Sequence, residues 1–211
     1  MRWMSDLSEQ VAESEEGCSL TSLSVLSDAQ RNDLNVKQDM ALNVVIAMTN
    51  LPTNPRNHFL EIQSTLLLRE WHVASSLCPR GQYVASAILT RAAIESLARV
   101  ACQSETDVGA KAWFDDEKVC FTDLLRDADT SGELLARRRE LSEIAHSKTA
   151  AGIAVVGSGI LLLGAQFDGP IFRKLTGVLD FVVAQFLRFA RESLAGSLQL
   201  DRDTRRLLGQ L

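Results

Sequence analysis

The stretch from Tyr83 to Cys102, YVASAILTRAAIESLARVAC, decides the fold. Apolar side chains cover this segment almost all round at the spacing of a helix. Such a helix is typical of the centre of a helical protein, because apolar residues on every side require packing partners on every side. The sequence therefore predicts an all-α fold in which residues 83–102 form the central helix.

Three charged residues interrupt this apolar helix. Arg91, Glu95 and Arg99 follow one another at intervals of four residues and share one narrow wedge of the helix. Unpaired charges on so apolar a helix would cost several kcal/mol each, so we expect them to be paired. The simplest interpretation is a structural pair of Arg91 and Glu95; the alternative is that the wedge faces the helix at residues 135–146 and supports a site there.

Apolar periodicity and its interruptions predict the remaining elements. Ser27 is the expected cap of a helix that ends before Pro52. We expect further helices over about 58–78, 117–127, 131–146 (with Ser131 as its cap) and 169–198, and a short one after Asp201. Residues 153–163 predict a short apolar β-hairpin with a glycine turn, or else a helix interrupted by glycines.

Length and charge limit the organisation. A chain of 211 residues with 46% hydrophobic content can bury one sizeable core, so we expect a single helical domain over 26–211. Residues 1–25 are polar and acidic, and either are disordered or dock on another surface. The net charge of −5 argues against binding of duplex nucleic acid over a broad basic surface, but it leaves room for a small basic pocket.

The cysteines and apolar runs indicate the compartment. The four cysteines have irregular spacing and no nearby histidine at a ligand distance, so we expect neither a zinc site nor a disulfide framework. The longest apolar run, 150–165, carries four glycines and is shorter than the roughly 20 residues that cross a bilayer. No secretory signal is recognisable. We expect a cytoplasmic protein with reduced thiols, no membrane segment, no metal and no cofactor.

The segment Leu135 to His146, LARRRELSEIAH, carries the strongest chemical pattern. Arg139 and His146 are separated by two helical turns, so they share one face at a backbone distance of roughly 10 Å. Both side chains can then reach one phosphodiester. Ser142 and Glu143 lie on the same stripe between them.

This pattern fits cleavage of RNA without a metal. That reaction needs a base for the 2′-hydroxyl, an acid for the leaving oxygen and a cation for the charge on phosphorus. Histidine serves the first two roles and arginine the third. Arg137 and Arg138 would give RNA a local landing strip. The alternative is a helix edge with solvated arginines, whose end is capped by His146.

Two other histidines are weaker candidates for a site. His58 is expected at the start of a helix. His72, beside Trp71, is expected to be a half-buried helix residue rather than a ligand.

The spacing R-x6-H resembles the R-x4–6-H motif of the HEPN superfamily. Residues 82–95 resemble the helix with an inward acid that precedes this motif, and Leu141-Ser142 before the histidine is similar to uncharacterised prokaryotic HEPN-like families. The resemblance covers about residues 60–190. It implies a bundle of four or five helices that dimerises and so joins two motifs into a composite ribonuclease site, as in toxins and antiviral (phage) defence proteins.

The resemblance also implies roles for individual residues. Arg139 would bind phosphate, His146 would be the general acid and base, and Glu95 would orient one of them. The chain departs from the pattern of active members at Glu140, where Asn, Asp or His commonly follows the arginine. A negative charge there would oppose an approaching phosphate, and the superfamily also has non-catalytic members.

Two functions therefore stay open. The first is a HEPN-like homodimer that binds RNA and cleaves it without a metal. The second is a non-catalytic, antitoxin-like interaction or regulatory protein, in which Arg91, Glu95, Arg139 and His146 form a structural polar network and the acidic residues 1–35 bind a protein partner. The apolar face expected on the helix at 169–198 would suit a contact between two copies.

Overall fold

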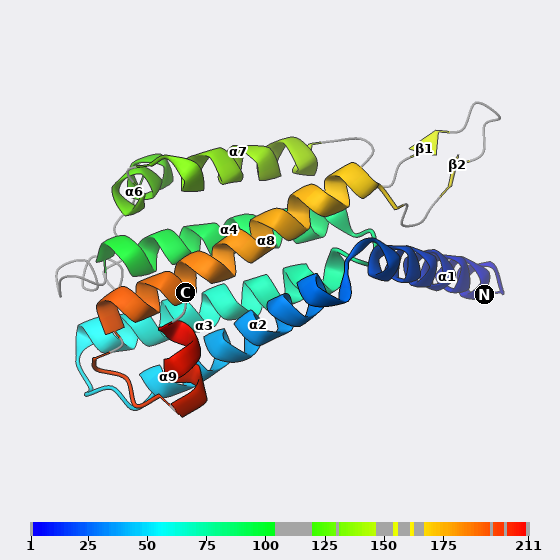
Figure 1. Ribbon diagram of the computed structural model, residues 1–211. Coiled ribbons are helices and arrows are strands. Elements are labelled where there is room, and N and C mark those ends of the chain that lie inside the picture. The colour runs from blue at the N-terminus through cyan, green and yellow to red at the C-terminus, as the bar shows by residue number, and fades with distance from the viewer. Residues whose placement is uncertain are drawn as a thin grey trace.

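The computed structural model describes residues 2–103, 120–129, 131–146, 154–155, 161–162, 167–194, 196–200 and 202–209. The fold is an all-α helical bundle, which confirms the predicted class (Figure 1). Its helices are α1 (Arg2–Val25), α2 (Asp28–Met48), α3 (Pro55–Leu77), α4 (Tyr83–Gln103), α6 (Phe121–Ala128), α7 (Glu133–Ala145), α8 (Gly169–Phe189) and α9 (Arg202–Leu208). A π-helical turn, Ala190–Leu194, follows α8.

Side-chain caps set where several helices begin. Ser27 forms a reciprocal capping box with Gln30, as its position before α2 predicts. Asn54 accepts the backbone N–H of Asn57, so α3 begins at Pro55, three residues before the expected start at His58. Proline suits this first position because it has no N–H that needs a partner.

The start of α7 differs from the expectation that Ser131 caps it. Gly132 is the capping residue and has a φ of 77°, a conformation that favours glycine. The carboxylate of Asp129 accepts the N–H groups of Ser131 and Leu134, at 2.9 Å each. Burial alone would raise the pKa of Asp129, but the hydrogen bond from the Ser131 hydroxyl, together with those from the backbone, lowers it. The oxygens that accept the first N–H groups of α7 thus come mainly from Asp129, two residues before the predicted cap Ser131.

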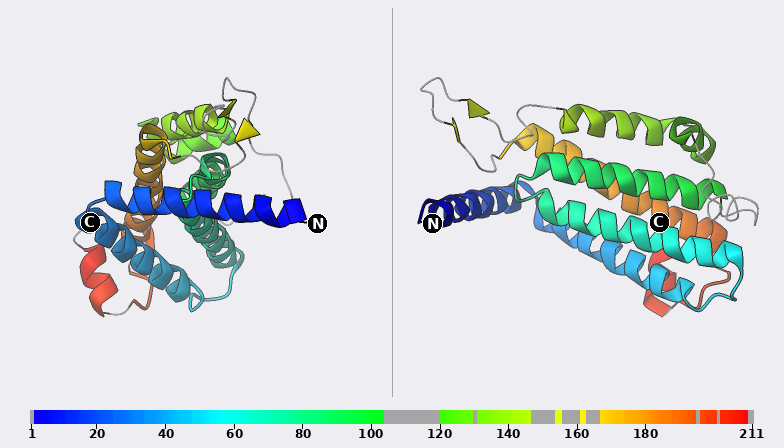
Figure 2. Two further views of the ribbon diagram at one scale, coloured as in Figure 1. Left: turned by 90° about the vertical axis from the view of Figure 1, so that its right-hand side faces the viewer. Right: turned by 180° about the vertical axis from the view of Figure 1, so that it is seen from behind.

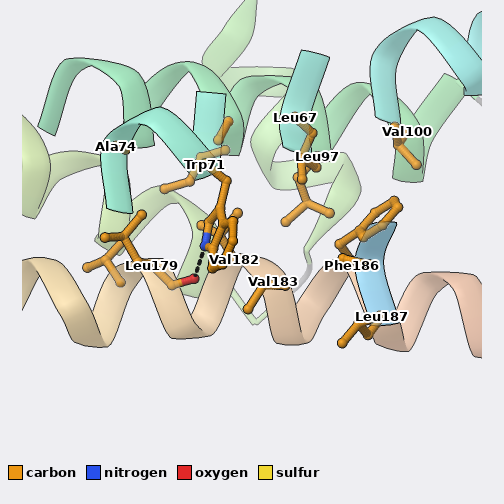
Figure 3. Close-up of a cluster of buried hydrophobic side chains, with 14 of the residues drawn as sticks. Leu67, Trp71, Ala74, Leu97, Val100, Leu179, Val182, Val183, Phe186 and Leu187 are labelled. Carbon is orange, nitrogen blue, oxygen red and sulfur yellow. Dashed lines mark hydrogen bonds between the residues drawn. The ribbon is translucent and has the colours of Figure 1, made fainter. Parts of the chain in front are cut away.

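The central position of α4 is also as predicted. It packs against α3, α6, α7 and α8, and both orientations of Figure 2 show it within the bundle. The apolar face of α8 lies against α3 and α4, where the indole Nε1 of Trp71 donates to the carbonyl oxygen of Leu179 over 2.8 Å (Figure 3). This face is buried within the chain, so the expectation that it contacts a second copy is wrong.

The polar segment that precedes the bundle is helical and forms α1, Arg2–Val25. Helix α1 crosses the end of the bundle where α3 turns into α4, and its first half extends beyond (Figures 1 and 2). Cys18 is buried, Ser22 donates to the carbonyl oxygen of Pro79 over 3.0 Å, and Gln82 donates to Glu15 over 2.7 Å. The second half of α1 is therefore attached to the bundle by packing and by hydrogen bonds.

The last third of the chain differs in its boundaries from the expected elements. Helix α8 ends at Phe189 rather than near 198. Two strands, β1 (Ala154–Val155) and β2 (Leu161–Leu162), pair antiparallel, while the turn expected between them lies outside the described residues. Within the described ranges, none of the helices combines the length and apolar character that a membrane span requires.

Candidate functional site

Helices α4 and α7 run antiparallel and form the walls of the candidate site (Figure 1). Leu134, Leu141 and Ile144 place α7 against the bundle through their buried side chains. Because the helices are antiparallel, the end of α7 at His146 lies beside the beginning of α4, and Arg138 lies beside Glu95. The predicted motif helix thus packs on the predicted central helix.

A solvent-open groove of about 250 Å³ lies between the two helices. Four of the predicted site residues contribute to its walls, together with small and apolar side chains. The lining residues are Ala87, Ile88, Arg91, Ala92, Glu95, Leu141, Ser142, Ala145 and His146. His146 is exposed directly after the last turn of α7, and its backbone N–H donates to the carbonyl oxygen of Ser142 over 3.1 Å.

Glu95, which lines this groove, binds two arginines, Arg91 in the groove and Arg138 beside it. Its Oε1 accepts the Nε–H of Arg91 over 3.3 Å and the Nε–H of Arg138 over 3.2 Å. The predicted pairing of Arg91 with Glu95 is confirmed, and the alternative that their wedge faces the motif helix is confirmed as well. One carboxylate shared by two guanidinium groups leaves this cluster with one net positive charge.

Arg139 occupies a different side of α7 from Arg138. Its side chain is exposed, it does not line the groove, and it has no hydrogen bond or ion pair with any residue in the described ranges. Glu95 therefore holds Arg138 rather than Arg139 or His146. A sequence signal for this exists, because Arg138 stands between Leu134 and Leu141 on the buried stripe of the helix.

Arg137 is engaged away from the groove. Its guanidinium group forms ion pairs with Glu133 and Glu140, at 3.2 Å each, and lies 5.5 Å from the ring centroid of Phe181 on α8. The carboxylate of Glu140, which follows Arg139 in the sequence, is thus paired with Arg137. This ion pair reduces the repulsion that Glu140 would exert on a phosphate at Arg139.

Ser142 and Glu143 have different surroundings on α7. The hydroxyl of Ser142 lines the groove and donates to the carbonyl oxygen of Arg138 over 3.1 Å. Glu143 is exposed and pairs with Lys174 on α8 over 3.5 Å. Only Ser142 of the two lies where a ligand in the groove could touch it.

The other histidines lie apart from the groove. His58 is in the first turn of α3, as predicted, 3.9 Å from Glu61. His72 is exposed rather than half-buried, because Trp71 takes the core position, and its Nδ1 lies 3.0 Å from the amide nitrogen of Gln38. In the described portions of the chain, no three His, Cys, Asp or Glu side chains are grouped so that they could hold a metal ion.

Comparison with known proteins returned no matching family model, no matching curated protein and no matching solved structure.

Proposed function

We propose that this chain is a HEPN-like, metal-independent endoribonuclease of the toxin or antiviral-defence type, which acts in the cytoplasm as a homodimer. The observation that carries the proposal is that His146 lines one open groove together with Arg91 and Glu95. The groove thus offers a group for proton transfer beside cationic donors, which is the combination that cleavage of a phosphodiester requires.

The proposed reaction is an internal transesterification. A base removes the proton of the 2′-hydroxyl, the 2′-oxygen bonds to phosphorus, and the bond from phosphorus to the 5′-oxygen breaks. An acid protonates that leaving oxygen, so the products are a 2′,3′-cyclic phosphate and a 5′-hydroxyl end. The groove contains one histidine, which supplies the base or the acid at a given moment but not both.

A second copy of the chain would complete the reaction. Its own His146 would supply the missing proton-transfer group, and the exposed Arg139 of each copy would contribute a further cation. The cluster of Arg91, Glu95 and Arg138 carries one net positive charge. This charge adds to the attraction for phosphate on a chain whose net charge is −5. A small basic groove on an acidic protein favours a local contact with an RNA strand over broad binding to a duplex.

A second candidate is a non-catalytic interaction protein of the antitoxin type. It is favoured by the ion pair between Arg138 and Glu95, whose side chains are only 20% and 21% exposed and which joins α7 to α4. In this interpretation the polar network stabilises the bundle. The acidic residues 1–35, with Leu20 and Leu23 exposed on α1, would then bind a protein partner.

The test compares RNA cleavage by matched variants. The wild-type protein, His146→Ala, Arg139→Ala and the control His72→Ala are incubated with total RNA in the presence of a chelator, and light scattering reports the oligomeric state. We expect the wild type and His72→Ala to cleave and the other two variants to be inactive while they remain folded dimers. If all four proteins are equally inert, the interaction protein becomes the better explanation.

A further inference from the structure

Arg91 and Arg138, two like charges, share one carboxylate partner, Glu95. Each guanidinium group donates its Nε–H to the same atom, Oε1 of Glu95. Within the described residues, the terminal nitrogens of both groups form no hydrogen bond. Each guanidinium group is thus held by its Nε–H, and its terminal N–H donors remain available to a ligand.

From this arrangement we infer that Arg91 and Arg138 form a phosphate-binding clamp, in which Glu95 positions both guanidinium groups and their terminal nitrogens bind the phosphate oxygens. For its natural ligand, a single RNA strand, the inference rests on the proposed function. The clamp would act as a subsite for binding, separate from the protons that His146 transfers.

The chemistry of the site favours an anion with several acceptor oxygens. A guanidinium group presents its donors in a planar fork that matches two oxygens of a phosphate. Arg91 is 43% exposed and lines the groove, so its fork is accessible from solvent. Arg138 does not itself line the groove; its side chain is 20% exposed and is fixed beside the groove by Glu95, which limits how many conformations it loses when it binds a ligand.

The charge around the clamp also favours an anion. Glu95 neutralises only one of the two arginines. Another acid that interacts with Glu95 is Glu70 on α3, whose carboxylate accepts the hydroxyl of Ser96 over 3.3 Å. Burial raises the pKa of Glu70 above its ordinary value.

The small residues beside the clamp leave room for the ligand. Ala87, Ala92 and Ala145 line the groove and do not fill its volume of about 250 Å³. Ile88 adds an apolar surface that is 55% exposed. A phosphate at the clamp could therefore bring the attached sugar and base along the groove toward His146.

The experiment measures binding without cleavage. One probe is inorganic phosphate, followed by NMR through the Nε–H signals of the arginines. The other is a fluorescent 2′-O-methylated oligouridylate, which cannot be cleaved because it has no free 2′-hydroxyl. The variants are Arg91→Gln, Arg138→Gln and Arg138→Lys, and the matched control is Arg188→Gln, which removes an exposed cation on α8 that pairs with Glu192.

We expect phosphate to shift the Nε–H signals of Arg91 and Arg138. Each change to Gln should weaken oligouridylate binding by about 10-fold and reduce the slope of log affinity against log salt by about 0.7. Arg138→Lys should keep the salt slope and still lose affinity, because lysine keeps the charge but lacks the fork. Arg188→Gln should change neither quantity. Circular dichroism and thermal unfolding verify that each variant is folded.

The outcomes separate this inference from the proposed function. If phosphate shifts both arginines but oligouridylate does not bind, the clamp is supported with a small phosphate compound as its ligand, and the ribonuclease proposal fails. If folded Gln variants bind oligouridylate with unchanged affinity and salt slope, the clamp is overturned, even when the wild type cleaves RNA. Absence of any phosphate-induced shift at the two arginines would overturn it as well.

Discussion

Arg138 and Arg139 are adjacent in the sequence but lie on different sides of α7. Arg138 donates to Glu95 over 3.2 Å, whereas Arg139 is exposed and makes no hydrogen bond or ion pair within the described parts of the chain. Successive residues of a helix are rotated by roughly 100°, so a shift of one position changes which helix face an arginine occupies. The arginine in the R-x6-H spacing is thus exposed to solvent outside the groove, and the one before it is in the polar network.

Loss of the shared carboxylate should destabilise the bundle. In Glu95→Gln, Arg91 and Arg138 lose their common negative partner and repel each other, so we expect the free energy of unfolding to fall by about 1–2 kcal/mol. Urea denaturation measures this. The control Glu192→Gln, in exposed ion pairs with Arg188 and Arg191, should change stability by less than about 0.5 kcal/mol. Equal effects of the two substitutions would contradict a specific role of Glu95.

The hydrogen bond from Trp71 on α3 to Leu179 on α8 should contribute measurably to stability. Trp71→Phe removes the indole N–H that donates to Leu179 and leaves a void in a fully buried site. We expect a loss of about 2–4 kcal/mol in the free energy of unfolding, measured with urea. Val73→Ala, at a position that is 39% exposed on the same helix, should cost less than about 1 kcal/mol. A Trp71→Phe variant as stable as the wild type would refute the importance of this contact.

Stability should decrease at alkaline pH. Burial raises the pKa of Cys78 to about 12, and burial also raises the pKa of Tyr83 to about 12, even though the phenol oxygen accepts the N–H of Asp168. In the unfolded chain, the cysteine thiol releases its proton at about pH 8.5 and the tyrosine phenol at about pH 10. The folded state therefore binds more protons than the unfolded state between these values and about pH 12.

The sign of the effect follows from this difference. The stabilisation is fully present below about pH 8 and is lost as the pH rises toward 12, with a slope of up to about 1.4 kcal/mol per pH unit for each group. Urea denaturation at several pH values measures it. Cys78→Ala and Tyr83→Phe should each flatten the decline relative to the wild type. A stability that stays constant from pH 8 to 11 would be incompatible with the two shifts.

Thiol labelling should distinguish the cysteines. Cys120 is exposed at the start of α6, whereas Cys78 is fully buried with a raised pKa. We expect an aromatic disulfide reagent at pH 8 to modify Cys120 at least about 100-fold faster than Cys78 in the native protein, and both at similar rates in urea. Mass spectrometry of the labelled peptides assigns the sites. Rapid labelling of Cys78 in the native state would show that this part of the core opens readily.

The proposed homodimer can be tested at the groove rim. Ile88 is 55% exposed beside His146, so a second copy that completes the site would cover it. We expect Ile88→Asp to be monomeric by light scattering and inactive in the metal-free cleavage assay. The control Ile46→Asp, at a position that is 53% exposed on α2, should remain dimeric and active. A dimeric, active Ile88→Asp would place the contact between copies elsewhere.

Much of the fold could be predicted from local patterns. Ser27 marks the start of α2 because a cap acts within one turn of chain, whereas the start of α3 at Pro55 was expected three residues later, at His58. The apolar circumference of α4 correctly predicted a central helix, since burial on every side is the only stable environment for it. The start of α7 was harder, because Ser131 and Asp129 both offer oxygens and the structure uses the aspartate for Leu134.

The candidate site was predictable only in part. His146, Arg91, Glu95 and Ser142 were singled out from the sequence, and they line one groove. The burial of the apolar face of α8 within the chain was not foreseen, because an apolar face looks the same in sequence whether a neighbouring helix or a second copy covers it.

The sequence by itself determined the helical class, several helix starts and the set of chemically capable residues, because these depend on interactions within one or two turns of chain. The tertiary structure alone decided that Arg138, rather than Arg139, meets Glu95 across α4 and α7. That choice depends on how the two helices are rotated against each other, and packing of Leu134, Leu141 and Ile144 into the core sets the rotation. Contacts between residues far apart in the sequence arise only from such packing, which no local pattern contains.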